Sequence, residues 1–136
     1  MMATARMEAT PVFERNFDGL LAYLRDVVNN PKSISPKRFG QVLQIDMQTL
    51  ATQAHVHRNT ISRAPEAESV QKFMRDTVRV IKAATDISGS VENAVYWYKN
   101  DPLTPFEYKT AQQLISEGRT DDIVRYISSL QAGFAG

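Results

Sequence analysis

Hydrophobic side chains recur along this chain at spacings of three and four residues, which is the repeat of an amphipathic α-helix. The first such stripe covers residues 17–28 and is followed by the helix-breaking sequence NNPKSISP. The longest stripe covers residues 66–87 and ends at the Ser-Gly-Ser sequence of residues 88–90. Neither an internal repeat nor a clear strand pattern is evident, so the sequence predicts an all-α fold.

Three short helices are predicted between these two stripes. Ser35 and Pro36 form a typical helix start, because the serine side chain can cap the helix and proline suits the first helical position. Asp46 is the corresponding cap of the next helix. A turn near His55 then leads into a third helix that starts at about residue 58. These helices form the central part of the chain.

The last third of the chain contains three further predicted helices. Residues 91–99 form the first, and the sequence NDPL is the turn after it. The sequence TPFE, residues 104–107, matches a capping box with proline at the first helical position, so the second helix is expected to begin there. Gly118 is suited to end it, and Thr120 is expected to cap the final helix. The last six residues, QAGFAG, are expected to fray.

This pattern divides the chain into an N-terminal arm over residues 1–31, a central region over residues 32–88 and a C-terminal helical domain over residues 89–136. A hydrophobic fraction of 43% and a charged fraction of 23% are typical of soluble globular proteins. We found no signal-like segment and no apolar run near the roughly 18 residues of a membrane span. The chain also has no cysteine, which fits a cytoplasmic protein without disulfides or membrane contact.

Charge is distributed unevenly, although the net charge is only +1. Residues 32–64 hold five basic side chains and one acidic side chain, a net charge of +4. Residues 91–136 hold four basic and six acidic side chains, a net charge of −2. A local basic patch is the electrostatic feature expected of a DNA contact.

The basic region includes the sequence TLATQAHVHRNTISRA, residues 49–64, which has the pattern of a helix-turn-helix. Ala51 is the small residue that lets two helices cross closely, and Val56 and Ile61 are apolar anchors for the second helix. The turn position at His55 requires a positive φ angle, which histidine tolerates better than most residues.

Polar side chains around these anchors have the chemistry to read DNA. Arginine suits guanine edges and phosphates, asparagine suits adenine, and polar residues at a helix start can bind a phosphate. The predicted DNA-binding residues are Gln48, Thr49, Arg58, Asn59, Thr60, Ser62 and Arg63. The alternative interpretation is that residues 35–64 are a helical subdomain whose polar face is only solvated.

No candidate catalytic or metal site emerges from the sequence. His55 and His57 are the only histidines, and without cysteine no third ligand is evident nearby, so turn geometry and capping explain both better. A glycine-rich phosphate loop and a nucleophile with a base motif are also missing from the sequence. We therefore expect neither enzymatic activity nor a cofactor.

The C-terminal sequence AVYWYKNDPLTPFEYKTAQQLISEGRTDDIVRYISSL resembles the toxin-binding domain of the MbcA/ParS/Xre family of antitoxins. The turn after the tryptophan, KNDPLTPFEY, departs from the usual family sequence. The helix-turn-helix pattern at residues 35–64 occurs where that family carries its Xre-like DNA-binding half. The features that carry the resemblance are Trp97, Asn100–Leu103, Lys109–Ala111, Leu114, Gly118 and Asp122–Val124.

The resemblance implies the antitoxin of a type II toxin–antitoxin pair. Such a protein occludes the active site of an NAD-consuming RES-type toxin and represses its own operon by binding operator DNA as a homodimer. Large aromatic residues and a rim of cations would form the toxin contact. The expected toxin-binding residues are Trp97, Tyr108, Lys109, Arg119, Ile123, Arg125, Tyr126 and Phe134.

Several alternatives remain open at this point. The tail that contains Phe134 is either a plug for the toxin or a frayed terminus. The stripe at residues 17–28 is core, a dimer seam or a partner helix. The whole protein is an antitoxin, a stand-alone helix-turn-helix regulator with a C-terminal dimerisation domain, or an interaction module that no longer binds DNA.

Overall fold

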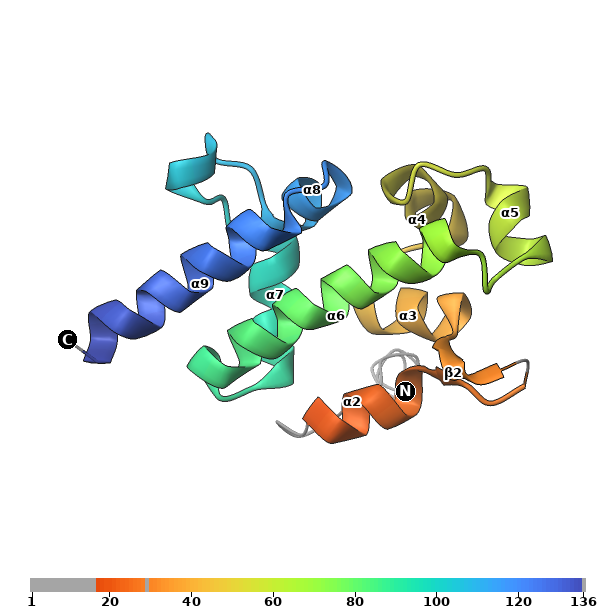
Figure 1. The fold of residues 1–136 in the computed structure, drawn as a ribbon, viewed down its shortest axis with the longest axis horizontal. Coiled ribbons are helices and arrows are strands. Elements are labelled where there is room, and N and C mark those ends of the chain that lie inside the picture. Colours follow the sequence, from red (N-terminus) through yellow and green to blue (C-terminus); the bar gives the residue numbers. More distant parts are fainter. Residues whose placement is uncertain (1–16, 29, 136) are drawn as a thin grey trace, which may run out of the picture.

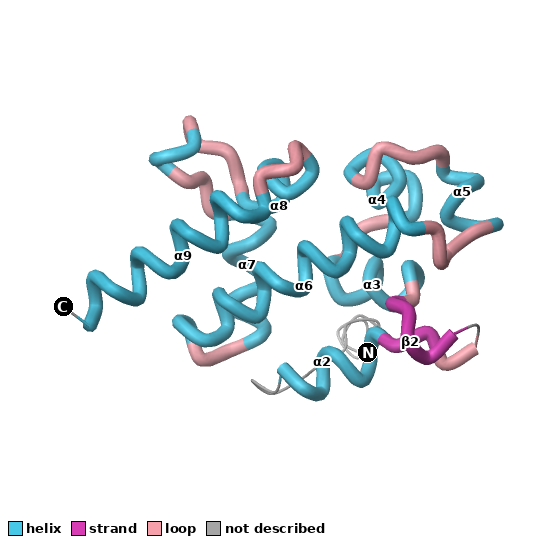
Figure 2. The backbone as a smooth tube through the Cα atoms, viewed as in Figure 1, coloured by secondary structure: helices cyan, strands magenta, loops and turns pink. Residues whose placement is uncertain are grey.

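The computed structural model describes residues 17–28 and 30–135, with the side chains of the last two of these residues left out. These residues form a mainly helical fold with one small two-stranded sheet (Figure 1, Figure 2). In the described part of the chain, no helix has both the length and the apolarity needed to cross a membrane. The elements are α2 (Phe17–Leu24), β1 (Arg25–Asp26), β2 (Asn30–Ile34), α3 (Pro36–Leu43), α4 (Met47–Gln53), α5 (Arg58–Arg63), α6 (Glu68–Ser88), α7 (Val91–Asn100), the 3₁₀ helix η1 (Thr104–Phe106), α8 (Ala111–Ser116) and α9 (Thr120–Ala135).

The central helix, α6, carries most of the core. All seven positions of its apolar stripe are buried, as the spacing predicts. Gln71, Val80 and Thr85 are buried as well, because other elements pack on more than one side of α6. Figure 1 shows α3, α4 and α5 around the N-terminal end of α6, with α7 and α9 along the rest of its length. The buried stripe is Val70, Phe73, Met74, Thr77, Val78, Ile81 and Ala84.

The N-terminal arm differs from the single helix predicted over residues 17–28. Helix α2 ends at Leu24, and the chain then forms the antiparallel hairpin of β1 and β2. Val27 and Val28, which complete the apolar stripe in the sequence, are 60% and 87% exposed at the hairpin turn. The all-α prediction is therefore wrong in this segment, because pairing with β2 replaces the last turn of the predicted helix.

Helix starts follow the predicted caps at the two central positions. The backbone N–H of Arg38 donates to Ser35 Oγ over 3.2 Å, and the N–H of Thr49 donates to Asp46 Oδ1 over 2.7 Å. These bonds satisfy N–H groups that have no partner within the helix. At the C-terminal end of α6, Gly89 has a φ of +78° and ends the helix as expected.

The predicted helix start at residues 104–107 is wrong. Only the short η1 forms there, because Glu107 and Tyr108 both have positive φ angles, of 60° and 66°. The loop then closes through an antiparallel bridge between Leu103 and Lys109. Helix α8 begins later, with a complete capping box between Thr110 and Gln113.

Helix α9 is longer than the sequence predicts. The segment QAGFA continues the helix to Ala135 instead of fraying. Asp121 and Asp122 occupy its first turn, where acidic side chains complement the helix dipole. Thr120 does not act as the predicted cap, because its hydroxyl oxygen is buried and has no hydrogen-bond partner in the described structure. Gly118, with a φ of +83°, makes the turn between α8 and α9.

A buried hydroxyl pair joins α6 to α7. Tyr98 and Thr77 are both 0% exposed, and their hydroxyl oxygens lie 3.1 Å apart. Burial raises the pKa of the Tyr98 hydroxyl, which therefore stays protonated and can share a hydrogen bond with Thr77. Each hydroxyl depends on the other for its partner inside the apolar core.

We predict that Tyr98→Phe and Thr77→Val each lower the free energy of unfolding by about 1–3 kcal/mol, because each leaves a buried hydroxyl without its partner. The double variant should lose less than the sum of the two, since it leaves neither hydroxyl behind. Urea denaturation measures all three values. Tyr96→Phe is the control, because Tyr96 is in the same helix and 66% exposed. Additive losses in the double variant would contradict this pairing.

The lowered pKa of the Asp46 carboxyl group should make the stability of the protein depend on pH. The Thr49 backbone N–H and hydroxyl, followed by the nearby charge of Arg58, lower the pKa of Asp46 below its ordinary value of 3.8. A lowered pKa in the folded state means that Asp46 stabilises the protein above pH 3.8 and loses this effect as the pH falls through the folded-state pKa.

We therefore expect Asp46→Ala to lower the free energy of unfolding at neutral pH, with a loss that shrinks as the pH falls below 3.8. Asp46→Asn is the matched control, because asparagine keeps the cap and does not titrate. Denaturation of the three proteins over a series of pH values provides the measurement. An equal loss in Asp46→Ala at neutral and acidic pH would show that the carboxylate charge does not matter.

Candidate functional site

Helices α4 and α5 pack against each other and are joined by a tight turn. Ala51 is 0% exposed and Ile61 is 5% exposed, so both residues lie in the core as predicted. His55 has a φ of +59°, which confirms the positive φ expected at the turn. The Val56 N–H donates to the Ala51 carbonyl oxygen over 3.0 Å and closes this turn.

The polar residues of α5 point away from this core. Arg58, Asn59, Ser62 and Arg63 are exposed, and Thr60 is half-buried. In the described structure, the four exposed side chains make no hydrogen bond or ion pair; we call them the α5 surface. They surround the buried Ile61 on the same short helix. The arrangement leaves two guanidinium groups and one amide free to bind a ligand.

Gln48 and Thr49, the two predicted DNA-binding residues on α4, already make hydrogen bonds within the protein. Gln48 is exposed, but its amide lies 3.5 Å from the Thr52 hydroxyl oxygen. Thr49 is half-buried and its backbone N–H is already bound to Asp46. The positive charge of Arg58 also helps to lower the pKa of the Asp46 carboxylate, which caps α4. Gln48 and Thr49 belong to α4, the helix that packs against α5.

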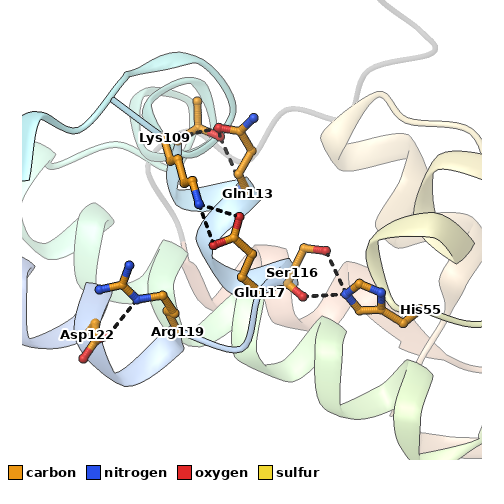
Figure 3. A network of polar contacts seen from close by, with 8 residues as sticks. His55, Lys109, Gln113, Ser116, Glu117, Arg119 and Asp122 are labelled. Carbon is orange, nitrogen blue, oxygen red and sulfur yellow. Dashed lines mark hydrogen bonds and ion pairs between the residues drawn. The ribbon is translucent and has the colours of Figure 1, made fainter. Parts of the chain in front are cut away.

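His55 has a second role that the sequence did not indicate. Its Nε2 lies 2.7 Å from the carbonyl oxygen of Ser116 in α8 (Figure 3). The Ser116 hydroxyl donates to the Gln53 carbonyl oxygen over 2.8 Å. These bonds join the α4–α5 turn to a helix 61 residues further along the chain. Among the described residues, no group of three potential metal ligands occurs.

The predicted toxin-contact cations all lie in ion pairs within the protein. Lys109 Nζ is 3.0 Å from Glu117 Oε2, and Arg119 Nε is 2.9 Å from Asp122 Oδ2 (Figure 3). Arg125 also binds Asp122. The hydrogen bond from Arg119, followed by the charge of Arg119 and the bond from Arg125, lowers the pKa of Asp122. Because these pairs are exposed, a partner can still compete for them.

The predicted aromatic contacts fall into separate environments. Tyr126 packs edge-on against Phe106, with ring centroids 5.7 Å apart. The guanidinium group of Arg119 stacks over the Phe106 ring. Tyr108 is 68% exposed in the loop before α8. Phe134 belongs to α9, but its side chain lies outside the described part of the structure.

Ile123 has to be removed from the predicted contact residues. Its side chain is 0% exposed and belongs to the hydrophobic core. The helical repeat explains this, because Ile123 and Ile127 lie on the same face of α9 and that face packs on α6. A core residue stabilises the fold and is not available to a partner.

The described structure also contains an apolar hollow that the sequence did not reveal. It lies between the end of α6, α7 and α9. Trp97 is the one predicted contact residue in its wall, and the flanking Ile87 and Leu130 are 36% and 38% exposed. We call this feature the apolar hollow; it is lined by Ala84, Ile87, Ser88, Ala94, Trp97, Ile127 and Leu130.

Two surfaces with different chemistry therefore stand out in the described structure. The α5 surface is cationic and polar, whereas the apolar hollow is lined by aliphatic residues, one tryptophan and one serine. Figure 1 shows α5 near one end of the molecule and the free end of α9 at the other. Comparisons with protein-family models, with curated proteins and with solved structures found no match to this chain.

Proposed function

We propose that this protein is an antitoxin that binds DNA through the α5 surface and a protein toxin through the surface around the apolar hollow and α9. The observation that carries the proposal is the α5 surface, which presents two arginines, an asparagine and a serine around one buried isoleucine. The positive-φ turn at His55 precedes it. The proposal has two parts, which rest on different residues and can be tested separately.

The DNA-binding part is supported by charge as well as by shape. On α6 and around α8 and α9, seven cationic residues are paired with carboxylates. Arg58 and Arg63 have no such ion pair in the described structure, so their charges remain available to phosphates and guanine edges. We propose that α4 and α5 act as a helix-turn-helix with α5 in the major groove. Binding as a homodimer fits the two-fold symmetry of most operators.

The toxin-binding part is supported by the apolar hollow and by the helix beside it. An apolar hollow whose lining includes the exposed Ile87 and Leu130 suits an apolar side chain of a protein partner. Residues 128–133 of α9 are exposed, and Figure 1 shows this end of the helix extending past the rest of the fold. We propose that α9 covers the entrance to the NAD site of a RES-type toxin, as the family resemblance implies.

We predict that Arg58→Ala and Arg63→Ala each weaken binding to operator DNA by about 1–3 kcal/mol per lost base contact. Fluorescence anisotropy with the DNA upstream of the coding sequence measures this change at several salt concentrations. Affinity of the unaltered protein should fall steeply with salt, because phosphate contacts release counterions.

Lys82→Ala is the matched control for these variants, because it removes the same charge from an exposed position on α6. We expect it to bind DNA as the unaltered protein does. Equal binding by all four proteins would exclude α5 as the recognition helix. A protein that binds DNA but neutralises no toxin would instead be a stand-alone regulator.

We predict that Leu130→Asp abolishes toxin neutralisation and leaves DNA binding unchanged, because it places a charge at the rim of the apolar hollow. Expression of the adjacent gene product alone should arrest growth and deplete NAD, and co-expression with the unaltered protein should restore both. Growth and cellular NAD are measured for each pair.

Leu21→Asp is the matched control for the toxin experiment. Leu21 is 40% exposed, against 38% for Leu130, and lies on α2 instead of α9. Protection should be retained in this variant. Full protection by Leu130→Asp would exclude the apolar hollow as the contact, and an adjacent product without toxicity would exclude the antitoxin function.

A further inference from the structure

A buried glutamine joins the β1–β2 hairpin to the segment that follows α5. Gln71 is 6% exposed near the start of α6. Its amide nitrogen donates to the carbonyl oxygens of Ile34 and Pro65, and its amide oxygen accepts from the Ile34 N–H, each over 2.9 Å. One side chain therefore satisfies three backbone groups on two segments that are 31 positions apart in the sequence.

These bonds fix where the hairpin lies. Ile34 ends β2, and Pro65 is two residues beyond the end of α5. Because one amide nitrogen binds both carbonyl oxygens, the end of the hairpin and the exit from α5 have to be neighbours. Figure 1 shows the hairpin and α5 at the same end of the molecule, away from the free end of α9.

The hairpin and α3 carry cations of their own. Arg25, Lys32 and Lys37 are exposed, and in the described structure their side chains make no ion pair. Arg25 and Lys37 line one hollow between the hairpin and α3. Among the described residues of its wall, Asp26 is the only acidic one, and it is 5% exposed. We call Arg25 and Lys37, together with the exposed Lys32 of the paired strand β2, the hairpin surface; all three residues are cationic.

The nearby sequence offers little to neutralise these charges. From residue 25 to residue 64 the chain has six basic and two acidic side chains, so the difference is +4. Of the two carboxylates, Asp26 is buried and Asp46 accepts the capping bond from Thr49. The hairpin and α5 thus both carry exposed cations and lie at the same end of the molecule.

We propose that the hairpin surface is a second DNA contact, which binds backbone phosphates of the same duplex that α5 enters. The proposal rests on the DNA-binding function proposed above and adds a site to it. Lysine and arginine on a hairpin beside a recognition helix can reach phosphates next to the groove, and such contacts strengthen binding without reading sequence. The three residues therefore contribute affinity and salt dependence, whereas the α5 surface contributes sequence preference.

The test compares the variant Arg25→Ala/Lys32→Ala/Lys37→Ala with the unaltered protein on operator DNA and on an unrelated duplex of equal length. We expect weaker binding to both, by the same factor. The slope of log affinity against log salt should become shallower by about 1 for each lost phosphate contact, or about 3 for the triple variant. All three residues are exposed, so circular dichroism should show an unchanged fold.

A matched control separates local contact from net charge. Lys72→Ala/Arg75→Ala/Lys82→Ala removes the same number of positive charges from exposed positions on α6. It should change the salt slope much less than the hairpin variant, because those residues lie outside the proposed contact. Equal slopes in the two triple variants would overturn the hairpin contact.

The outcomes also distinguish this proposal from the function on which it rests. If the unaltered protein binds neither duplex, the DNA-binding function fails and the hairpin contact fails with it. If binding depends on Arg58 while the hairpin variant keeps its affinity and slope, only the hairpin contact is wrong. If the hairpin variant changes the sedimentation of the free protein instead, this surface joins two copies of the chain and the phosphate contact is overturned.

Discussion

The packing of α6 on several sides is the constraint on which the rest of the structure depends. Near its start, Phe73 packs edge-on against Phe39 of α3, and Gln71 holds the hairpin and the exit from α5. Further along, the Thr77 hydroxyl meets that of Tyr98 in α7. A single helix thus contacts β2, α7 and α9 and, through Gln71, the segment that follows α5. Because Gln71 and Thr77 are buried, their polar groups are hydrogen-bonded to neighbouring elements instead of being solvated.

A second connection between the two parts of the molecule is polar. His55 in the α4–α5 turn and Ser116 at the end of α8 are bound to each other (Figure 3). The Ser116 hydroxyl also binds the Gln53 carbonyl oxygen. Movement of α8 relative to α4 would have to break these bonds. The positive φ of His55 is therefore part of a tertiary contact as well as of a turn.

Cations paired with carboxylates and cations without such a partner lie on different parts of the described surface, and the net charge of +1 does not reveal this difference. On α6 and around α8 and α9, seven cations lie 3.0 Å or less from carboxylates, so each of these charges has an opposite charge beside it. Arg58 and Arg63 have no such partner in the described structure. The proposal of a DNA contact depends on this contrast more than on composition, because unpaired cations are what a phosphate can bind.

The sequence by itself determined features that depend on neighbouring residues. The buried stripe of α6, the caps at Ser35 and Asp46 and the positive φ at His55 follow from helical periodicity, short-range hydrogen bonds and local sterics. The exposure of Arg58 follows from the position of Ile61 for the same reason.

Only the tertiary structure decided the rest. The stripe at residues 17–28 could not reveal that α2 ends at Leu24, because the hairpin is held by Gln71, far along the chain. The bridge from Leu103 to Lys109 likewise displaces the start of α8. Ile123 faces the core because α9 packs on α6. In each case contacts between distant residues outweigh a local preference, and local preferences are weak beside tertiary packing.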